Sequence, residues 1–455
     1  MKKTVWEKID DGQREKLFAF CEDYRRFLSA SKTERAFVKN AAALAEAAGF
    51  MPLHEKKTLA PGDRVYVTNR NKNIFLFVIG SRPLTEGLNI LGAHIDSPRT
   101  DLKQVPLYES EGIALLDTHY YGGIKKYQWV ARPLSLCGVI VKKDGTVIDV
   151  NLGEKEGDPV FGISDLLIHL ASKQMVKKAN EVIEGEKLDI TFASIPLADT
   201  EKDAVKANVL EMLKKEYGVE EDDFLSAEIE AVPAGEARDY GIDRSMIIGY
   251  GHDDRACAYT SLRALLDMEA AEKTACVMLV DKEEIGSVGA TSMQSRFFEM
   301  VLSEMLEKQG YSGIVSLNRT FAASKVLSND VAIAFDPNYP EVMEKKNSAY
   351  FGKGVAFLKF TGARGKSGSN DACAEYMARI RQIMDDADIT FQTAELGAVD
   401  AGGGGTIAYV LGNLNMDVID AGIPVQNMHA PCEVVSKADV YEAYRAYRTF
   451  LEKMN

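Results

Sequence analysis

The chain has 455 residues, 46% of them hydrophobic, and a formal net charge of −14. This apolar content is enough for a large packed core of two or three domains, and it excludes a mostly disordered chain. An acidic surplus repels nucleic-acid phosphates and anionic lipid, and no run has the pattern of a secretory signal or the length of a membrane span. We therefore expect a soluble, cytoplasmic protein that binds neither nucleic acid nor membrane.

The six cysteines lie far apart, and no Cys-x-x-Cys pair occurs. Because a chain of this length does not need disulfides to fold, the spacing predicts thiols that are reduced and buried.

The N-terminal part predicts helix followed by strand. Residues 11–50 have helical periodicity, with Ser31 and Glu34 placed as a capping box ahead of a second apolar stretch. The short apolar runs NIFLFVIG (73–80) and LNILGAHIDSP (88–98) predict two buried strands.

Residues 102–241 differ from the rest of the chain in their expected secondary structure. We expect a hairpin around Asp144-Gly145, one helix within 199–218, and strands within 188–195 and 224–232. This segment therefore predicts a strand-rich α+β domain.

After residue 241, strands and helices alternate. The expected strands lie within 275–281, 330–335, 355–360, 388–394 and 416–422, and the expected helices within 295–308, within 371–384 and after Ser436. Such alternation predicts an α/β fold with a mostly parallel sheet flanked by helices. We expect residues 1–101 and 242–455 to form this domain and residues 102–241 to be inserted in it.

Open α/β sheets place their sites beyond the carboxyl ends of their strands. His94 and Asp96 end one apolar run and point the same way in extended backbone. A metal-binding imidazole usually donates its other ring N–H to a carboxylate, so Asp96 could hold His94 or orient another ligand. The alternative is a histidine that merely ends a strand.

His252, Asp253 and Asp254 precede a predicted helix. Carboxylates at a helix start are stabilised by the helix dipole, so capping alone could explain them. Capping needs only one aspartate, however. Asp253 could bridge two cations while Asp254 caps the helix or orients its neighbour.

The stretch LVDKEEIGSVGATSM places Asp281, Glu283 and Glu284 directly after an apolar strand. Burying unpaired carboxylates costs several kcal/mol, so adjacent acids beside a core strand need cations or a shared proton. Neighbouring side chains diverge in extended backbone, so one glutamate could bind metal while the other acts as general base. The alternative is a solvated acidic turn.

Two further places carry candidate ligands. Asp330 precedes a predicted strand and Asp336 follows it, and periodicity does not choose between them. His429 lies between a short strand and the last helix, where a structural role is the alternative.

Together these places supply imidazoles and several carboxylates, a mixture that suits zinc, and the number of acids suits two ions. Cobalt or manganese would accept the same ligands. No His-Glu-x-x-His motif is present, so the pattern predicts a dinuclear hydrolase in which metals activate water and a glutamate moves the proton.

The motifs GAHIDSP, GHDDRA, DKEEIGSVGA, SNDVAIAF with DPNYP, and GIPVQNMHAPCE occur in this order over nearly the whole chain. In this the chain resembles the aspartyl aminopeptidase family, metallopeptidase family eighteen, whose members are dinuclear zinc exopeptidases. The resemblance implies a cis peptide between Asp253 and Asp254. It also implies roles for seven residues: His94, Asp253 (bridging), Glu284, Asp330 and His429 as metal ligands, Glu283 as general base, and Asp96 as orienting catalytic residue.

The resemblance further implies an α/β metallopeptidase domain with an inserted dimerisation domain, assembled as a tetrahedral dodecamer that admits peptides. The glycine-rich stretch 398–412 then lines the substrate cleft. It lacks the Gly-Lys-Ser/Thr ending of a phosphate-binding loop.

Family members prefer acidic N-terminal residues, and Lys359 occupies roughly the place of a family lysine that meets the acidic side chain. An exposed strand lysine is the alternative. The chain departs from the family at Asp336 and Asp165, which stand where the family has histidine. Both changes replace a cation by an acid, which counts against an acidic preference.

Other functions fit the same residues. An amidase or a tetrahedral aminopeptidase of the same clan would share the site chemistry, and only the latter would require a free α-amine. A non-catalytic metal-binding assembly protein would hydrolyse no peptide.

Overall fold

The computed structural model describes residues 3–362 and 364–454, which group into two compact units. The first unit consists of Met1–Asp96, Ala237–Met428 and Glu433–Asn455. The second consists of Ser97–Glu236 and His429–Cys432. Among the described residues, no helix is both long and apolar enough to cross a membrane.

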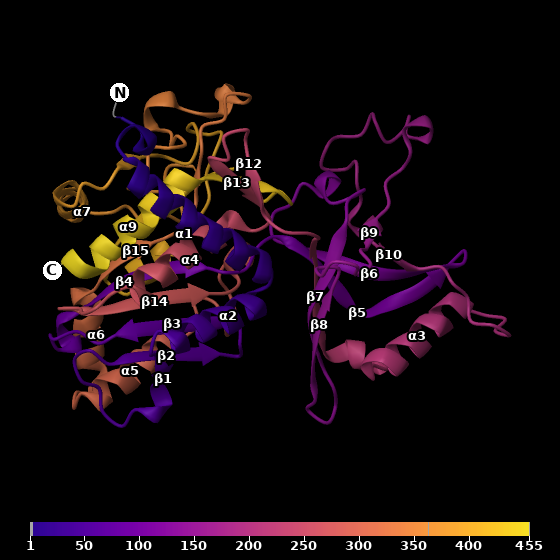
Figure 1. The fold of residues 1–455 in the computed structure, drawn as a ribbon, viewed down its shortest axis with the longest axis horizontal. Helices are drawn as coiled ribbons and strands as arrows, with labels where there is room; N and C mark the ends of the chain where they lie inside the picture. Colours follow the sequence, from indigo (N-terminus) through magenta and orange to yellow (C-terminus); the bar gives the residue numbers. More distant parts are fainter. Residues whose placement is uncertain (1–2, 363, 455) are drawn as a thin grey trace. The chain divides into compact units, whose positions relative to one another are not determined.

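The first unit is built on a nine-stranded sheet (Figure 1). Its strands, in spatial order, are β1 (Met51–Pro52), β2 (Arg64–Asn69), β3 (Asn73–Val78), β14 (Thr274–Val280), β4 (Leu88–His94), β15 (Lys325–Ser328), β19 (Asp417–Gly422), β17 (Val355–Leu358) and β18 (Phe391–Thr393). The central strands β14, β4, β15 and β19 pair in parallel. The predicted mostly parallel α/β sheet is therefore confirmed.

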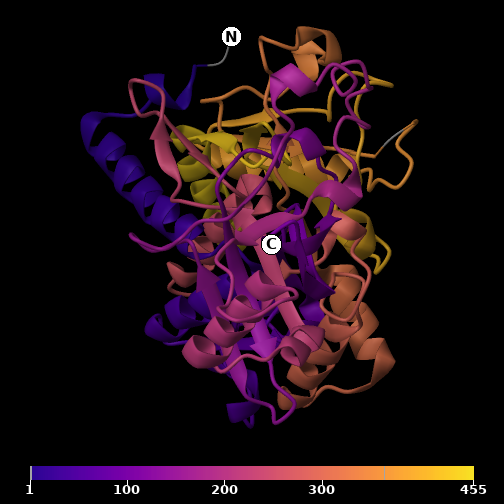
Figure 2. The same cartoon turned by 90° about the vertical axis from the view of Figure 1, so that its right-hand side faces the viewer.

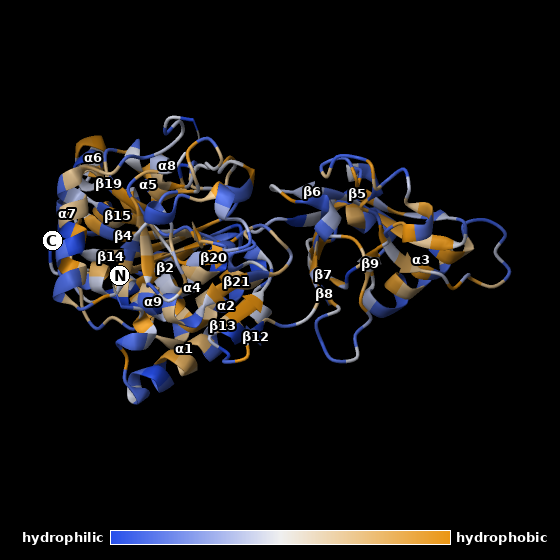
Figure 3. Ribbon diagram, turned by 90° about the horizontal axis from the view of Figure 1, so that it is seen from above, coloured by the Kyte–Doolittle hydropathy of each residue, from blue (hydrophilic) through white to orange (hydrophobic). Residues whose placement is uncertain are grey.

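Helices cover both faces of this sheet. Figure 3 shows the sheet between two helical layers, and in Figure 2 the indigo α1 and the orange α5 and α6 lie on opposite sides. One layer contains α1 (Asp11–Ala30), α2 (Glu34–Ala47), α4 (His252–Leu266), α7 (Ala374–Asp386) and α9 (Lys437–Lys453). The other contains α5 (Phe297–Lys308), α6 (Gly313–Ala323) and α8 (Ala408–Gly412).

Strand β3 shows why the sheet needs both layers. Ile74, Leu76 and Val78 belong to one hydrophobic core, whereas Phe75 and Phe77 belong to the other. Alternate side chains of a strand point to opposite faces, so a continuous apolar run is buried only when helices cover both.

A smaller five-stranded sheet in the unit changes one prediction. Its strands are β12 (Arg238–Tyr240), β13 (Met246–Gly249), β21 (Glu433–Ser436), β20 (Pro424–Gln426) and β16 (Ala332–Ile333). The strand expected within 330–335 is the short β16 of this sheet and is not part of the main sheet. In the main sheet, β15 lies between β4 and β19. Asp330 therefore follows a strand of the main sheet.

The second unit contains a seven-stranded antiparallel sheet and one α-helix, α3 (Ala204–Tyr217). Its strands, in spatial order, are β8 (Val147–Leu152), β7 (Leu134–Val141), β11 (Ala227–Pro233), β5 (Arg99–Ser110), β6 (Ile113–Tyr121), β10 (Ile190–Ala193) and β9 (Gly162–Ile163). The predicted hairpin around Asp144 is confirmed, because β7 and β8 pair antiparallel across it.

Two local predictions were wrong. The N-cap of α2 is Thr33, whose Oγ1 accepts the N–H of Ala36 at 3.1 Å, so Glu34 is the first residue of the helix and cannot complete a capping box with Ser31. Four cysteines are buried, but Cys373 and Cys432 are exposed, since they lie outside the core strands and helices.

Candidate active site

The carboxyl ends of three neighbouring parallel strands bring the candidate residues together. His94 is the last residue of β4 and pairs in register with Val280, the last residue of β14. Glu283 and Glu284 follow β14, and Asp330 follows β15. Because adjacent parallel strands end at one edge of the sheet, side chains far apart in the sequence meet there.

Helix α4 supplies the aspartates. The peptide bond between Asp253 and Asp254 is cis, as the family resemblance implies. The N–H of Asp253 donates to Oε2 of Glu433 at 2.9 Å, and Oδ2 of Asp254 accepts the N–H of His94 at 3.2 Å. Asp254 thus joins α4 to the end of β4.

The imidazole of His94 has a fixed orientation. Its Nδ1 lies 3.1 Å from the carbonyl oxygen of Asp96, so the proton belongs on Nδ1. Its Nε2 lies 3.1 Å from Oδ1 of Asp253 and 3.9 Å from Oδ1 of Asp330. The nitrogen that can bind metal therefore faces two carboxylates.

Asp96 orients the two glutamates. Its side chain is fully buried, and its two oxygens accept the N–H groups of Glu283 at 3.1 Å and Glu284 at 3.2 Å. Glu283 begins a single 3-10 turn, Glu283–Ile285, so adjacent side chains diverge from this anchored backbone. Asp96 fixes the position from which both carboxylates extend.

Two triads of side chains have the composition of a metal site. Ligand atoms of His94, Glu283 and Asp330 lie within 4.8 Å of one another, and so do those of His94, Asp253 and Glu284. One imidazole with two carboxylates in each triad is a donor set that suits zinc. The residues present therefore fit the metal that the sequence predicts.

The electrostatics of the cluster favour cations. Burial raises the pKa of Asp254 and of Asp330 well above the ordinary range of aspartate. Burial opposes a charge on His94, but the hydrogen bonds to Asp253 and Asp96 raise its pKa well above the usual value. Several acids share this buried space, so bound cations would relieve their mutual repulsion.

Two other candidate ligands lie outside the triads. Asp336 accepts the N–H of Asn338 at 2.8 Å and so forms a turn, whereas Asp330 joins a triad. His429 belongs to the second unit, where its Nδ1 lies 2.9 Å from the carbonyl oxygen of Gly123. This contact leaves Nε2 as the nitrogen with a lone pair, and the role of His429 as a ligand stays a prediction.

Asp281 and Lys359, which are also candidates from the sequence, belong to neither triad. Oδ2 of Asp281 accepts the hydroxyl of Thr291 at 2.6 Å, so this buried acid holds the turn that carries the glutamates. Lys359 forms an ion pair with Asp371, which also pairs with Lys366 at 2.8 Å.

Sequence reasoning missed two buried residues that support the site. Glu433 holds the backbone of Asp253, and its nearness in the sequence to His429 was the only signal. Arg255 is fully buried, and its Nε donates to the carbonyl oxygen of Ile95, between His94 and Asp96, at 3.1 Å.

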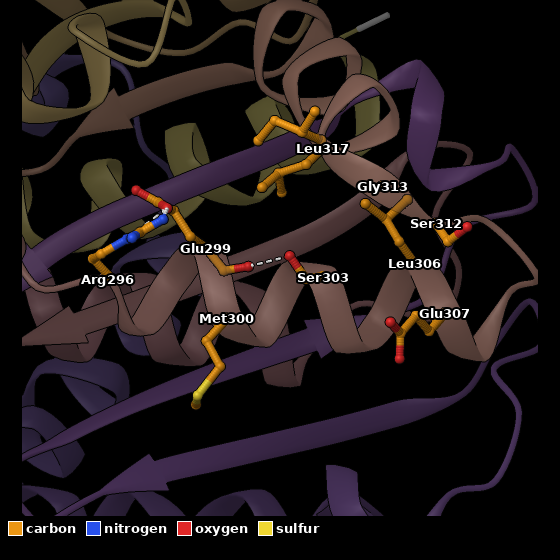
Figure 4. A pocket seen from close by; sticks show the side chains of 10 residues that line it. Arg296, Glu299, Met300, Ser303, Leu306, Glu307, Ser312, Gly313 and Leu317 are labelled. Atoms are coloured by element: carbon orange, nitrogen blue, oxygen red, sulfur yellow. Dashed lines mark hydrogen bonds and ion pairs between the residues drawn. The ribbon is translucent and has the colours of Figure 1, made fainter.

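A surface groove of about 560 Å³ lies between α5 and the start of α6 (Figure 4). Met300 and Leu317 line it, and at one end Arg296 pairs with Glu299 at 2.8 Å. None of the predicted site residues is among its lining residues, so this groove is separate from the triads.

The chain is similar to known proteins over nearly its whole length. Residues 27–451 match the sequence profile of the family described as aminopeptidase I zinc metalloprotease (M18). The chain is 55% identical to a probable M18 family aminopeptidase 1 of Clostridium acetobutylicum, over 99% of this chain and 98% of that protein.

Solved structures show the same similarity. The crystal structure of an M18 family aminopeptidase from Thermotoga maritima has a TM-score of 0.97 and 45% identity, and that of aminopeptidase I from Clostridium acetobutylicum has a TM-score of 0.93 and 53% identity. Each comparison covers 100% of both chains. The chain therefore belongs to the M18 family of aminopeptidases, which are zinc metalloproteases and hydrolases.

Proposed function

We propose that this chain removes single N-terminal residues from peptides with two zinc ions held by His94, Asp253, Glu284, Asp330 and His429. The observation that carries the proposal is the convergence of one imidazole and four carboxylates, in two triads that share His94. Two ions near one another allow one carboxylate to bridge them, as in other two-metal hydrolases.

The ligand roles are those that the family resemblance implies. His94 would bind with Nε2, and Asp253, whose Oδ1 lies 3.1 Å from that nitrogen, would bridge the ions. Asp330 and Glu284 each complete a different triad, and His429 is the further ligand that we propose for the second ion.

Glu283 is the general base. Bound zinc would polarise the scissile carbonyl and make water more acidic. The Glu283 carboxylate, anchored through its backbone to Asp96, takes the proton of the attacking water and returns it to the leaving amine. Asp96 acts without touching substrate, by orienting His94 and both glutamates.

Preference for acidic N-terminal residues is the weakest part of the expectation from the family. The ammonium group of Lys359 could attract an acidic substrate side chain, but it already forms an ion pair with Asp371. We propose that Lys359 meets an acidic substrate side chain only in competition with Asp371, so the preference is modest.

We also propose that the chain forms a homo-oligomer through the second unit, expected to be a tetrahedral dodecamer built from dimers. Large apolar side chains of this unit are exposed, among them Ile168 and Leu170 at 67% and Val176 at 84%. These exposed apolar side chains lie close together in the sequence, and an exposed apolar patch is typical of a protein interface. Light scattering of the purified protein tests this: a monomer at micromolar concentration would refute it.

The variant Glu283→Gln tests the proposed chemistry. We expect it to hydrolyse no aminoacyl arylamide or peptide while it retains two zinc ions, since Glu283 moves a proton and is not a required ligand. Full activity with both ions present would refute the role of Glu283. Wild-type cleavage of N-acylated substrates, in place of those with a free α-amine, would identify an amidase instead.

A further inference from the structure

One hydroxyl joins the glycine-rich loop to the main sheet. Oγ1 of Thr406 donates to Oδ1 of Asp420 at 2.6 Å and accepts the N–H of Ala408 at 3.3 Å. Asp420 is only 1% exposed and lies on β19. Burial raises the pKa of Asp420 to about 6, so at neutral pH the carboxylate is ionised and accepts a charge-assisted hydrogen bond.

This tether lies next to strands that carry proposed ligands. Asp420 pairs in register with Ser328, two residues before Asp330. After Thr406 the chain packs on β4, where a Cβ added to Gly92 would lie 3.1 Å from Cδ1 of Ile407. Gly92 is two residues before His94, so the loop ends beside the metal site.

The loop itself, Gly402–Gly405, presents bare backbone. A Cβ on Gly402 would lie 2.1 Å from the carbonyl oxygen of Leu396, which requires glycine there. The carbonyl of Gly404 accepts the N–H of Gly362 at 2.6 Å. Within the part of the chain that the structure describes, the N–H groups of Gly403 and Gly405 donate no hydrogen bond, and both residues are exposed.

We propose that Thr406 is a positioning residue whose bond to Asp420 fixes the glycine-rich loop, so that its exposed N–H groups bind the main chain of the peptide substrate. Main-chain recognition of this kind holds an extended peptide whatever its side chains are. Successive glycines have the largest conformational freedom of any segment, so the loop needs a tether to keep its N–H groups in place. The inference rests on the proposed peptidase function.

Thr406→Val tests the tether, because valine keeps the shape of threonine and removes the hydroxyl. We expect KM for a tripeptide to rise about tenfold, the loss expected for one hydrogen bond to a charged group. We expect kcat to change by less than about twofold and the zinc content to be unchanged, since the bond orients the loop and not the metal ligands. Thr406→Ser should restore KM.

A matched control is Thr320→Val. Thr320 is also buried, and its Oγ1 donates to the carbonyl oxygen of Ser316 at 2.9 Å in α6, away from the loop. We expect this variant to leave KM unchanged. If valine at position 406 prevents folding, Thr406→Ala should give the same increase in KM.

Hydrogen exchange of the amides in residues 402–406 provides a second measurement, and we expect it to accelerate in Thr406→Val alone. An unchanged KM in a folded Thr406→Val variant, or equal losses in the Val and Ser variants, would overturn the inference. Wild-type protein that cleaves no peptide would instead refute the proposed function, and unchanged loop exchange in Thr406→Val would then overturn the tether as well.

Discussion

Nε2 of His94 lies 3.1 Å from Oδ1 of Asp253, although the two residues come from a strand end and a helix start far apart in the sequence. Both side chains are nearly fully buried. A buried carboxylate and imidazole at this distance can share a proton or a cation, and the further acids nearby favour the cation.

Asp253→Ala should lose both zinc ions, because Asp253 is the proposed bridge. Measured after dialysis, the zinc content per chain should fall from two to well below one. Asp267→Ala is the control, since Asp267 ends the same helix and pairs with Arg263 at its surface. Two tightly held ions in Asp253→Ala would exclude the bridging role.

Asp96→Asn should weaken zinc binding about tenfold to a hundredfold, the usual cost of losing a partner that orients ligands. An asparagine can accept only one of the N–H groups of Glu283 and Glu284, because its amide nitrogen is a donor. Zinc competition with a chelator measures the change. Asp336→Asn should bind zinc as the wild type does, since asparagine forms the same turn.

Asp371→Asn should raise kcat/KM for substrates with N-terminal Asp or Glu, relative to Leu, by up to about fivefold. An exposed ion pair such as that of Lys359 with Asp371 contributes only about 0.2–1 kcal/mol. A substrate carboxylate that binds Lys359 must break this pair, so removing Asp371 saves the substrate at most that free energy. A panel of aminoacyl arylamides measures the ratio. An unchanged ratio would show that Lys359 does not contact the substrate side chain.

Asp439 predicts a pH dependence of stability. It accepts the N–H groups of Gly352 at 2.8 Å and Gly354 at 2.7 Å, and burial raises its pKa from 3.8 to about 8. The folded chain therefore holds a proton that the unfolded chain releases. The stabilisation is fully present below about pH 4 and is lost as pH rises through about 8.

Asp439→Asn should flatten the decline in unfolding free energy over that pH range, as measured by urea denaturation at a series of pH values. It should also be less stable than the wild type at low pH, because one of the two glycine N–H groups loses its acceptor. A slope equal to that of the wild type would contradict the role of Asp439.

The residue types of the site could be predicted from the sequence because polar residues that end apolar runs stand out. His94, Glu283 and Glu284 are such residues, and the structure places them at adjacent strand ends. Periodicity could not choose between Asp330 and Asp336, since the deciding fact is tertiary: Asp330 follows β15 of the main sheet. Glu433 was missed because its contact with Asp253 is with the backbone, which leaves no pattern in the sequence.

The main sheet could be predicted from the pattern of apolar runs along the sequence. Continuous apolar runs such as β3 and β14 predict strands covered on both faces, and alternation with helices predicts parallel pairing. The five-stranded sheet was not predictable, because β16 and β20 are two and three residues long and carry no periodicity. The run 330–335 is apolar, but its hydrogen bonding to β20 depends on tertiary packing.

Anomalous scattering at the zinc edge, from crystals of the wild-type protein, tests the central claim most directly. We predict two zinc peaks about 3.5–4 Å apart, in contact with His94, Asp253, Glu284 and Asp330. A single peak, or peaks that lie away from His94 and Asp253, would contradict the account.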